Sequence, residues 1–273
     1  MCVLAIGATL KWKGFSRGPL PLSVDERLAA SKSAGDELLA ADSVLIVGGG
    51  LIGTELTGDL AAYAAQAKNT SIQITLVHSG EHLCPEMSPA AAARVKEQLE
   101  AKGVRVILNE RATPAGEGKY TLKSGEIIEA AQVVMTTGLA SCSHFLKGGD
   151  LADCVNEQGW ITTDDYFRVV DAGGQIFALG DCCTTLPNAA VQVLQNIAVV
   201  GHNVQASLDG PADEAKLKKF SLGPAAFLAT TGTDQGVADM GGGYWTTWFL
   251  PWLKQKTMFY FRPRMELGLT SVE

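Results

Sequence analysis

The chain has 273 residues, of which 47% are hydrophobic, so it is long enough for two packed domains and disorder is not expected. Its formal net charge is −7 and its lysines and arginines are dispersed, which argues against nucleic-acid binding, because that needs a concentrated basic face. The six cysteines include no C-x-x-C pair and no histidine lies at zinc-site spacing. We therefore expect no metal and a reducing, cytoplasmic location, with an organellar location left open.

The chain opens on an apolar segment, Val3 to Thr9, which predicts a buried strand running into a glycine turn. Such a strand has nothing before it with which to pair, so we expect that sequence is missing upstream. A helix is predicted to follow from about residue 23 to residue 41.

A strand, a glycine turn and a helix are predicted next. The strand from Ser43 to Val47 runs into Gly48-x-Gly50-x-x-Gly53, after which residues 54–67 favour a helix. In a dinucleotide fingerprint the first glycine makes the turn, the second admits the pyrophosphate, and the third lets helix and strand pack closely. Glycine turns also join strands to helices without a ligand, but the flanking elements favour NAD(P)H binding. The candidate residues are Gly48, Gly50, Leu51, Ile52 and Gly53.

The second strand, from about residue 71 to Val77, ends without the acidic residue that usually binds the adenine ribose and selects NAD. His78 stands there instead and is a candidate contact to a ribose or a 2′-phosphate. A solvated histidine at a strand end is an equally good interpretation, so NAD and NADP both remain open. Glu55, two positions after Gly53, is either a first-turn glutamate that stabilises the helix dipole or a functional residue.

Strands and helices continue to alternate beyond this point, which predicts an α/β fold with a parallel sheet. Ser88 and the proline after it are expected to begin a helix that reaches Ala101. A strand at residues 104–108, a hairpin at residues 120–128 and a buried strand at residues 132–137 follow, and the last of these ends at Gly138, a further candidate NAD(P)H contact.

A second dinucleotide signature lies at residues 175–181, where an apolar strand ends in Gly180 and Asp181. An aspartate there can accept hydrogen bonds from polyol hydroxyls, and the N-terminus of the next helix, predicted at residues 188–208, can face a flavin and its phosphates. A strand ending in Gly-Asp is common in turns. Its partnership with the first glycine turn makes it specific.

The motifs together resemble those of the two-dinucleotide flavoprotein oxidoreductases, and among them the apoptosis-inducing-factor-like, ferroptosis-suppressor type NAD(P)H:quinone reductases. Residues 43–62 resemble that family's pyridine-nucleotide motif, in which the glutamate matched by Glu55 lies near the nicotinamide. Residues 176–181 resemble its second flavin motif, in which the aspartate matched by Asp181 holds the ribityl chain. Residues 5–9, including Ala8 and Thr9, resemble the A-T-G segment that closes the flavin site, and residues 227–238 resemble its C-terminal β segment.

This resemblance implies an FAD-dependent enzyme that passes hydride from NAD(P)H to flavin and on to a quinone-like acceptor. The implied fold is a Rossmann-like NAD(P)-binding domain (residues 42–150) inserted in a partial FAD-binding domain (residues 1–41 and 151–210), with a small C-terminal α+β segment (residues 211–273). The family's first flavin motif has no counterpart here. A non-catalytic NAD(P)H-binding or interaction protein is therefore the alternative, and the sequence gives no oligomeric state.

Two features lie beyond the second flavin motif. Cys182 and Cys183 could form a redox dithiol, but core packing beside the flavin is the favoured interpretation, since adjacent cysteines form strained rings. Gln195 is a candidate contact near the flavin or quinone, because quinone-reducing relatives use glutamines in this region. The alternative for Gln195 is the polar face of a helix.

The C-terminal part from residue 244 to residue 264 combines aromatic and basic residues. Tryptophans beside cations suit a membrane interface, where the rings lie at headgroup depth and the cations meet anionic lipid. The alternative is that these aromatic rings pack on the body of the protein. The basic residues are Lys254, Lys256, Arg262 and Arg264.

Overall fold

The computed structural model describes residues 1–10, 23–68, 71–185, 190–208, 210, 213–221, 226–252 and 254. They form two compact units, each treated separately below. The first unit contains the described residues of Met1–Lys11 and Gly138–Pro224, and the second contains those of Gly18–Thr137 and Ala225–Glu273.

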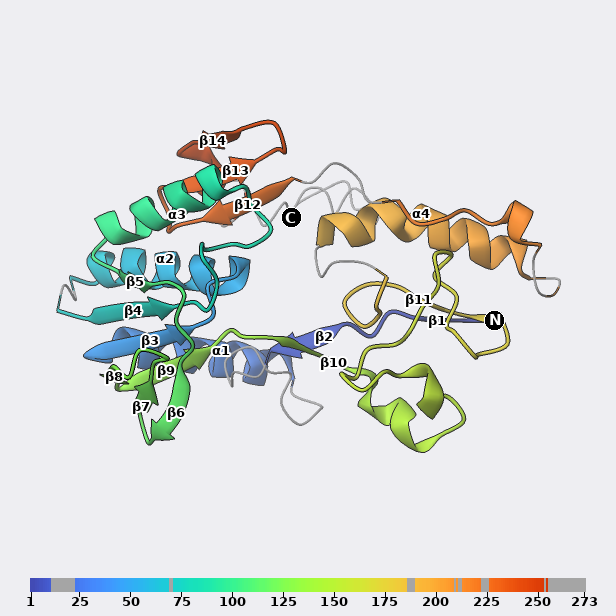
Figure 1. The fold of residues 1–273 in the computed structure, drawn as a ribbon, viewed down its shortest axis with the longest axis horizontal. Helices are drawn as coiled ribbons and strands as arrows, with labels where there is room; N and C mark the ends of the chain where they lie inside the picture. The colour runs from blue at the N-terminus through green and yellow to red at the C-terminus, as the bar shows by residue number, and fades with distance from the viewer. Residues whose placement is uncertain are drawn as a thin grey trace. The chain divides into compact units, whose positions relative to one another are not determined.

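A four-stranded parallel sheet forms the centre of the second unit, in the order β5-β4-β3-β9. Helices cover one face of it, as Figure 1 shows for α2 and α3, and the apolar residues on that face join one core with the two helices. This arrangement confirms the predicted α/β fold. The elements are α1 (Val24–Leu39), β3 (Ser43–Val47), α2 (Leu51–Gln66), β4 (Gln73–Val77), α3 (Pro89–Ala101), β5 (Arg105–Ile107) and β9 (Gln132–Met135).

The other face of the sheet is covered by an antiparallel meander of β6 (Thr113–Gly116), β7 (Lys119–Thr121) and β8 (Ile127–Glu129). Leu122 and Ile128 of this meander pack against Leu45, Val47 and Val77 of the sheet. Side chains alternate between the two faces of a strand, so neighbouring residues of β3 contribute to different cores. The predicted hairpin is present as β7 and β8.

Three C-terminal strands pack on the helices α2 and α3 and add a further layer to the second unit. They form an antiparallel sheet of β12 (Phe227–Thr230), β13 (Gly236–Asp239) and β14 (Tyr244–Thr246), followed by the short helix α5 (Phe249–Pro251). The approach is close at Gly58 of α2, where a Cβ atom would lie 2.4 Å from the carbonyl carbon of Thr231. Helix and β layer therefore touch backbone to backbone.

Asp239 ties this C-terminal sheet to the beginning of α3. Its buried carboxylate accepts hydrogen bonds from the backbone N–H of Ser88 at 2.6 Å and of Gly241 at 3.1 Å. These bonds, with that from Ser88 the stronger, lower the pKa of Asp239 below its ordinary value. Ser88 is also the N-cap of α3, as predicted, and its side chain accepts from the N–H of Ala91.

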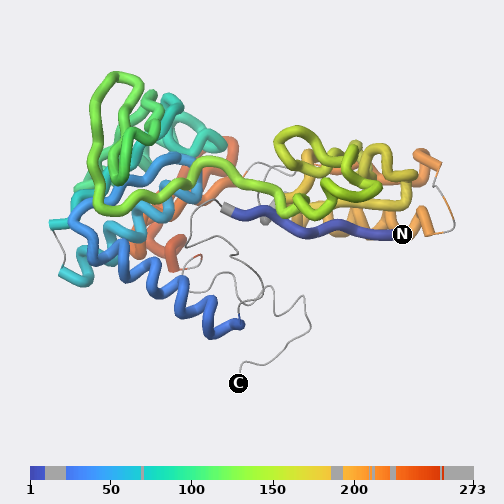
Figure 2. The backbone as a smooth tube through the Cα atoms, turned by 90° about the horizontal axis from the view of Figure 1, so that it is seen from below, coloured from blue at the N-terminus to red at the C-terminus, as the bar shows by residue number. Residues whose placement is uncertain are grey.

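The first unit brings together segments that are far apart in the sequence. Strand β1 (Cys2–Leu4) pairs in parallel with β11 (Ile176–Ala178), and β2 (Ala8–Leu10) pairs antiparallel with β10 (Leu139–Ser141), so the N-terminal segment runs alongside the chain near residue 140 (Figure 2). Phe167, Phe177, Leu179 and Val200 form a core with α4 (Ala190–Ala206). Short 3-10 helices span Ser143–Gly148, Ala152–Cys154 and Glu214–Lys216.

Two sequence predictions are wrong in detail. From Val3 to Thr9 the predicted strand and glycine turn are present, as β1 and a turn at Gly7, whose φ is +68°. The strand is not buried, however, since Val3 is 44% exposed because β1 belongs to a two-stranded sheet. Helix α2 begins at Leu51 rather than at residue 54, since Gly50 is its N-cap and Gly53 lies inside its first turn.

We predict that Asp239→Ala lowers the free energy of unfolding by about 1.5 to 3 kcal/mol, the range for hydrogen bonds to a charged group. The pKa of Asp239 is lowered in the fold, so its contribution is present at neutral pH and is lost as the pH falls through that lowered pKa. Urea unfolding at pH 7 and at acid pH measures both effects. Asp234→Ala is the control, because Asp234 is 59% exposed and its ion pair with Lys102 is worth less than about 1 kcal/mol. Equal losses for the two variants would contradict the prediction.

Candidate functional site

Gly48 and Gly53 allow α2 to start against the end of β3. Gly48 has a φ of +117°, and a Cβ there would lie 2.8 Å from Oγ1 of Thr136. A Cβ on Gly53 would lie 1.8 Å from the carbonyl oxygen of Gly48, which no adjustment of a side chain can relieve. Both glycines are therefore required by the protein's own packing.

Gly50 is different, because neither the backbone conformation nor the packing of the protein requires glycine at this position. Its φ of −70° suits any residue, and a Cβ added there would meet no protein atom within 4 Å. The first bond of α2 runs from the N–H of Thr54 to the carbonyl of Gly50, so the N–H groups of Leu51, Ile52 and Gly53 have no acceptor within the helix. An open backbone at a helix N-terminus fits the pyrophosphate of a dinucleotide.

Backbone and hydroxyl contacts hold the turn in place. Oγ1 of Thr136 donates to the carbonyl of Gly48 at 2.8 Å, the N–H of Gly48 donates to Val77 at 2.9 Å, and the N–H of Cys84 donates to the carbonyl of Gly49 at 2.7 Å. Burial raises the pKa of the Cys84 thiol to about 12, so this thiol stays protonated. Thr136 could not be predicted as part of the turn, since only the pairing of β9 with β3 brings it there.

His78 lies beneath the turn. Its Nδ1 accepts a hydrogen bond from the N–H of Gly49 at 3.1 Å, so the proton of the neutral ring lies on Nε2. Nε2 is buried and has no partner among the described residues. Burial, reinforced by the nearby His82, lowers the pKa of His78, and the ring is neutral at pH 7. The predicted contact of His78 to a ribose or 2′-phosphate stays a prediction, as does the choice between NAD and NADP.

Glu55 is held by the C-terminal part of the chain. Its Oε1 accepts hydrogen bonds from the N–H of Thr230 at 3.1 Å and from the hydroxyl of Thr230 at 3.3 Å. Nζ of Lys254 forms an ion pair with the same oxygen and also donates to the carbonyl of Leu228 at 3.0 Å. The sequence grouped Lys254 with the basic residues of the tail and missed this pairing. Glu55 is thus oriented at the start of the helix that carries the glycine turn.

The residues predicted to hold the flavin lie in the first unit. Strand β11 leads into Gly180, whose φ is +89°, and Asp181. The N–H of Leu179 donates to the carbonyl of Leu4 at 3.0 Å, which continues the parallel pairing of β1 with β11. Of the four predicted flavin contacts, Gly180 and Asp181 follow the carboxyl end of β11, where ligands of parallel sheets bind. The other two, Ala8 and Thr9, lie in β2.

Three other predicted features have clear positions. Cys182 and Cys183 are buried in an apolar core, which confirms core packing. Gly138 follows β9 and has a φ of +75°. Gln195 lies on α4 with an exposed side chain, next to the buried Asn196, whose amide donates to the carbonyl of Ser221 at 3.0 Å. The roles of Gly138 and Gln195 stay predictions.

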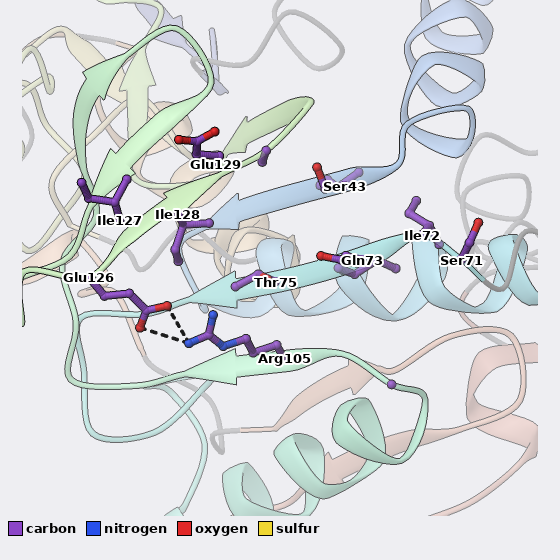
Figure 3. Close-up of a pocket in the computed structure, with 14 residues that line it drawn as sticks. Ser43, Ser71, Ile72, Gln73, Thr75, Arg105, Glu126, Ile127, Ile128 and Glu129 are labelled. Carbon is purple, nitrogen blue, oxygen red and sulfur yellow. Dashed lines mark hydrogen bonds and ion pairs between the residues drawn. The ribbon is translucent and has the colours of Figure 1, made fainter.

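A groove of about 460 Å³ lies at the amino ends of the strands of the central sheet. Figure 3 shows the residues that line it. It is lined by Ser43, Gln73 and Arg105 from the amino ends of three strands, and by the meander. Nη2 of Arg105 bonds both carboxylate oxygens of Glu126 at 2.8 and 3.0 Å. The glycine turn lies at the carboxyl ends of the same strands, so this groove is separate from the nucleotide site.

The two units together define a class. A parallel sheet with an open glycine turn, and a second sheet ending in Gly-Asp, are the parts of an oxidoreductase that uses two dinucleotides. The chain belongs to the pyridine nucleotide-disulphide oxidoreductase family, whose model matches residues 1–198. Membership confirms the predicted family and its cofactors, FAD and NAD(P)H.

Relatives support the same assignment. The chain is 27% identical to ferroptosis suppressor protein 1 of Xenopus tropicalis, over 93% of this chain and 70% of that protein. It is 26% identical to an NAD(P)H dehydrogenase (quinone) of Mycobacterium tuberculosis (strain CDC 1551 / Oshkosh), over 77% of this chain and 41% of that one. The structure of NDH2 from Plasmodium falciparum in complex with NADH has a similar fold, with a TM-score of 0.69 and 16% identity, covering 98% of this chain and 74% of that one.

We predict that Gly50→Ala and Gly53→Ala separate the two roles of the glycines. Gly50→Ala is expected to leave the melting temperature unchanged and to abolish NAD(P)H binding, because its methyl group enters the space left open for the pyrophosphate. Gly53→Ala is expected to lower the melting temperature by several degrees, since overpacking costs about 1–3 kcal/mol. Thermal unfolding and calorimetric titration measure these effects. Undiminished NAD(P)H binding by Gly50→Ala would contradict the assignment of the site.

Proposed function

We propose that this chain is a flavin-dependent oxidoreductase that takes electrons from NAD(P)H and delivers them to a quinone-like acceptor. The observation that carries the proposal is the open backbone at Gly50, at the N-terminus of α2 and the carboxyl edge of a parallel sheet. A relative whose name gives a quinone as acceptor supports the class of substrate. FAD, when bound, supplies the chemistry that accepts hydride and passes electrons onward.

The chain's own residues bind and orient the cofactors in this proposal. The N–H groups at the start of α2 bind the pyrophosphate of NAD(P)H, and Glu55 positions the nicotinamide. Thr230 and Lys254 fix the carboxylate of Glu55, so it is oriented before the nucleotide arrives. In the first unit, Asp181 accepts hydrogen bonds from the ribityl chain, and Gln195 lies near the flavin or the quinone.

A non-catalytic NAD(P)H-binding protein is the second candidate. It is favoured by the sequence, which contains one G-x-G-x-x-G and not the two that the family uses. The second unit alone would serve this role, because the glycine turn and its supports are all within it.

We predict that the full chain, supplied with FAD, oxidises NADH or NADPH with a short-chain quinone as acceptor. Glu55→Gln keeps an acceptor for Thr230 and loses the ion pair, so kcat is expected to fall about ten- to hundredfold with little change in KM for the nucleotide. Glu97→Gln is the control, because Glu97 is 63% exposed and pairs only with Arg94 among the described residues. Steady-state kinetics measures both. A colourless protein that binds NAD(P)H without oxidising it would favour the non-catalytic candidate instead.

We also propose a peripheral contact with membranes, for a cytoplasmic protein, through an aromatic surface of the second unit. The residues of this surface are exposed to solvent, and Trp248 is 79% exposed. The sequence has no acidic residue between Met240 and Met265, although the chain as a whole is acidic. Lys254 is engaged by Glu55, and the three other cations of this segment, Lys256, Arg262 and Arg264, lie outside the described residues. The aromatic surface consists of Met240, Tyr244, Trp245, Trp248, Phe249 and Trp252.

Exposed tryptophans beside a basic segment suit the headgroup region of an anionic bilayer. Among the described helices, none has the length and apolarity to cross a bilayer. We predict that the Trp245→Ser and Trp248→Ser double variant binds phosphatidylserine-containing vesicles about tenfold more weakly or worse, as measured by co-sedimentation. Phe145→Ser is the control, because Phe145 is an exposed aromatic residue of the first unit. Equal binding by the wild type and the double variant would contradict the proposed contact.

A further inference from the structure

The hydrogen bond between His78 and Gly49 is the one contact of the glycine turn that depends on a titratable side chain among those described. The other contacts come from the hydroxyls of Thr136 and Thr54 and from backbone groups, which do not titrate between pH 5 and 8. Nδ1 of the imidazole accepts a hydrogen bond from the N–H of Gly49, with 3.1 Å between the two nitrogens. This geometry makes the shape of the turn dependent on the protonation of one ring.

We propose that His78 positions the pyrophosphate-binding turn by accepting a hydrogen bond from the N–H of Gly49. Protonation of Nδ1 breaks this bond, releases the turn and weakens dinucleotide binding. This inference rests on the proposed function of the turn. His78 does not need to touch the nucleotide in this role. It acts through the backbone at Gly49, immediately before the open residue Gly50.

A protonated ring cannot keep this contact, because Nδ1 then carries a hydrogen and faces the N–H of Gly49, donor against donor. The ring packs against the backbone of two glycines, Gly49 and Gly80. A Cβ on Gly49 would lie 2.8 Å from Cβ of His78, and a Cβ on Gly80 would lie 2.8 Å from its Nε2. The contact that holds the N–H of Gly49 is therefore lost when the ring gains its second proton.

The other ring nitrogen of His78, Nε2, makes no hydrogen bond to the described residues. It is the one buried side-chain nitrogen or oxygen of the described residues that has no hydrogen-bond partner. A buried donor without an acceptor costs about 1–3 kcal/mol, so Nε2 makes no contact that would explain the position of the ring. The bond that Nδ1 makes to the turn accounts for its position.

The charges around the ring favour the neutral form on balance. Burial opposes the charged imidazolium, His82 in the following loop acts in the same direction, and Glu86 acts in the opposite one. From the end of β5, Glu110 donates its backbone N–H to the carbonyl of His78, and its carboxylate is occupied by the N–H of Ser124. Cys84, on the same loop as His82, is un-ionised at these pH values. The pKa of His78 is thus below its ordinary value, and the turn is held at pH 7 and released as the pH falls.

The experiment is calorimetric titration of the full chain with NAD⁺ between pH 5.5 and 8. NAD⁺ is the probe because its pyrophosphate keeps its charge over this range, whereas the 2′-phosphate of NADP⁺ titrates near pH 6. For the wild type we expect affinity to fall as the pH is lowered, by at most about tenfold per pH unit for one linked proton. His144→Asn, an exposed histidine of the first unit, is the control and should keep this dependence.

Two variants test the role of Nδ1. His78→Asn places an amide oxygen where Nδ1 accepts, so its affinity should match that of the wild type at pH 8 and should not change with pH. His78→Leu has no acceptor and should bind about three- to tenfold more weakly at every pH, the effect of one hydrogen bond. Thermal unfolding of each variant at each pH shows whether the protein is folded during the titration.

Three results would overturn the inference. They are an affinity of His78→Asn that falls with pH as in the wild type, an affinity of His78→Leu equal to that of the wild type at pH 8, and a wild-type affinity that does not depend on pH. A wild type that binds neither NAD⁺ nor NADP⁺ would instead overturn the proposed function, and this inference with it. Restored pH-independent binding in His78→Asn, with weak binding in His78→Leu, would support a positioning role that mere packing of the ring would not produce.

Discussion

The close approach of α2 to the end of β3 is the constraint on which the proposed NAD(P)H site depends. A Cβ at Gly53 would overlap the carbonyl oxygen of Gly48, so the helix can start here only because glycine stands at that position. This approach directs the N-terminus of α2 toward the carboxyl edge of the sheet, leaving Gly50 open to a phosphate. The supports from Thr136 and His78 then fix the position of a turn whose course the glycines have already set.

A second layer completes the site from the other side of α2. The C-terminal strands reach the helix at Gly58 and present Thr230 and Lys254 to Glu55, while Asp239 fastens the same sheet to α3. The orientation of Glu55 therefore depends on residues that lie outside the strand, turn and helix of the fingerprint. In the proposed mechanism the fingerprint binds the dinucleotide, and the C-terminal layer orients Glu55 of α2, the group that addresses the nicotinamide.

Local patterns made much of this fold predictable from the sequence. The glycine spacing and the serine cap of α3 involve residues a few positions apart, so the sequence carries their geometry directly. The pairing of Glu55 with Lys254 and of Asp239 with Ser88 could not be predicted, because each depends on how distant layers pack. The exposure of β1 was missed for a related reason: an apolar run predicts a strand but not the number of strands beside it. His78 was noticed for its place after β4, whereas the direction of its ring depends on the fold.

The separation in sequence of these contacts has a consequence for how the site assembles. The bond between His78 and Gly49 closes a loop of 29 residues, whereas the bonds from Thr230 and Lys254 to Glu55 close loops of 175 and 199 residues. Longer closures cost more chain entropy and slow folding. In the proposed site, the turn that binds the phosphates is thus expected to form early in folding and the orientation of Glu55 late, so nucleotide binding would precede the positioning of the nicotinamide for chemistry.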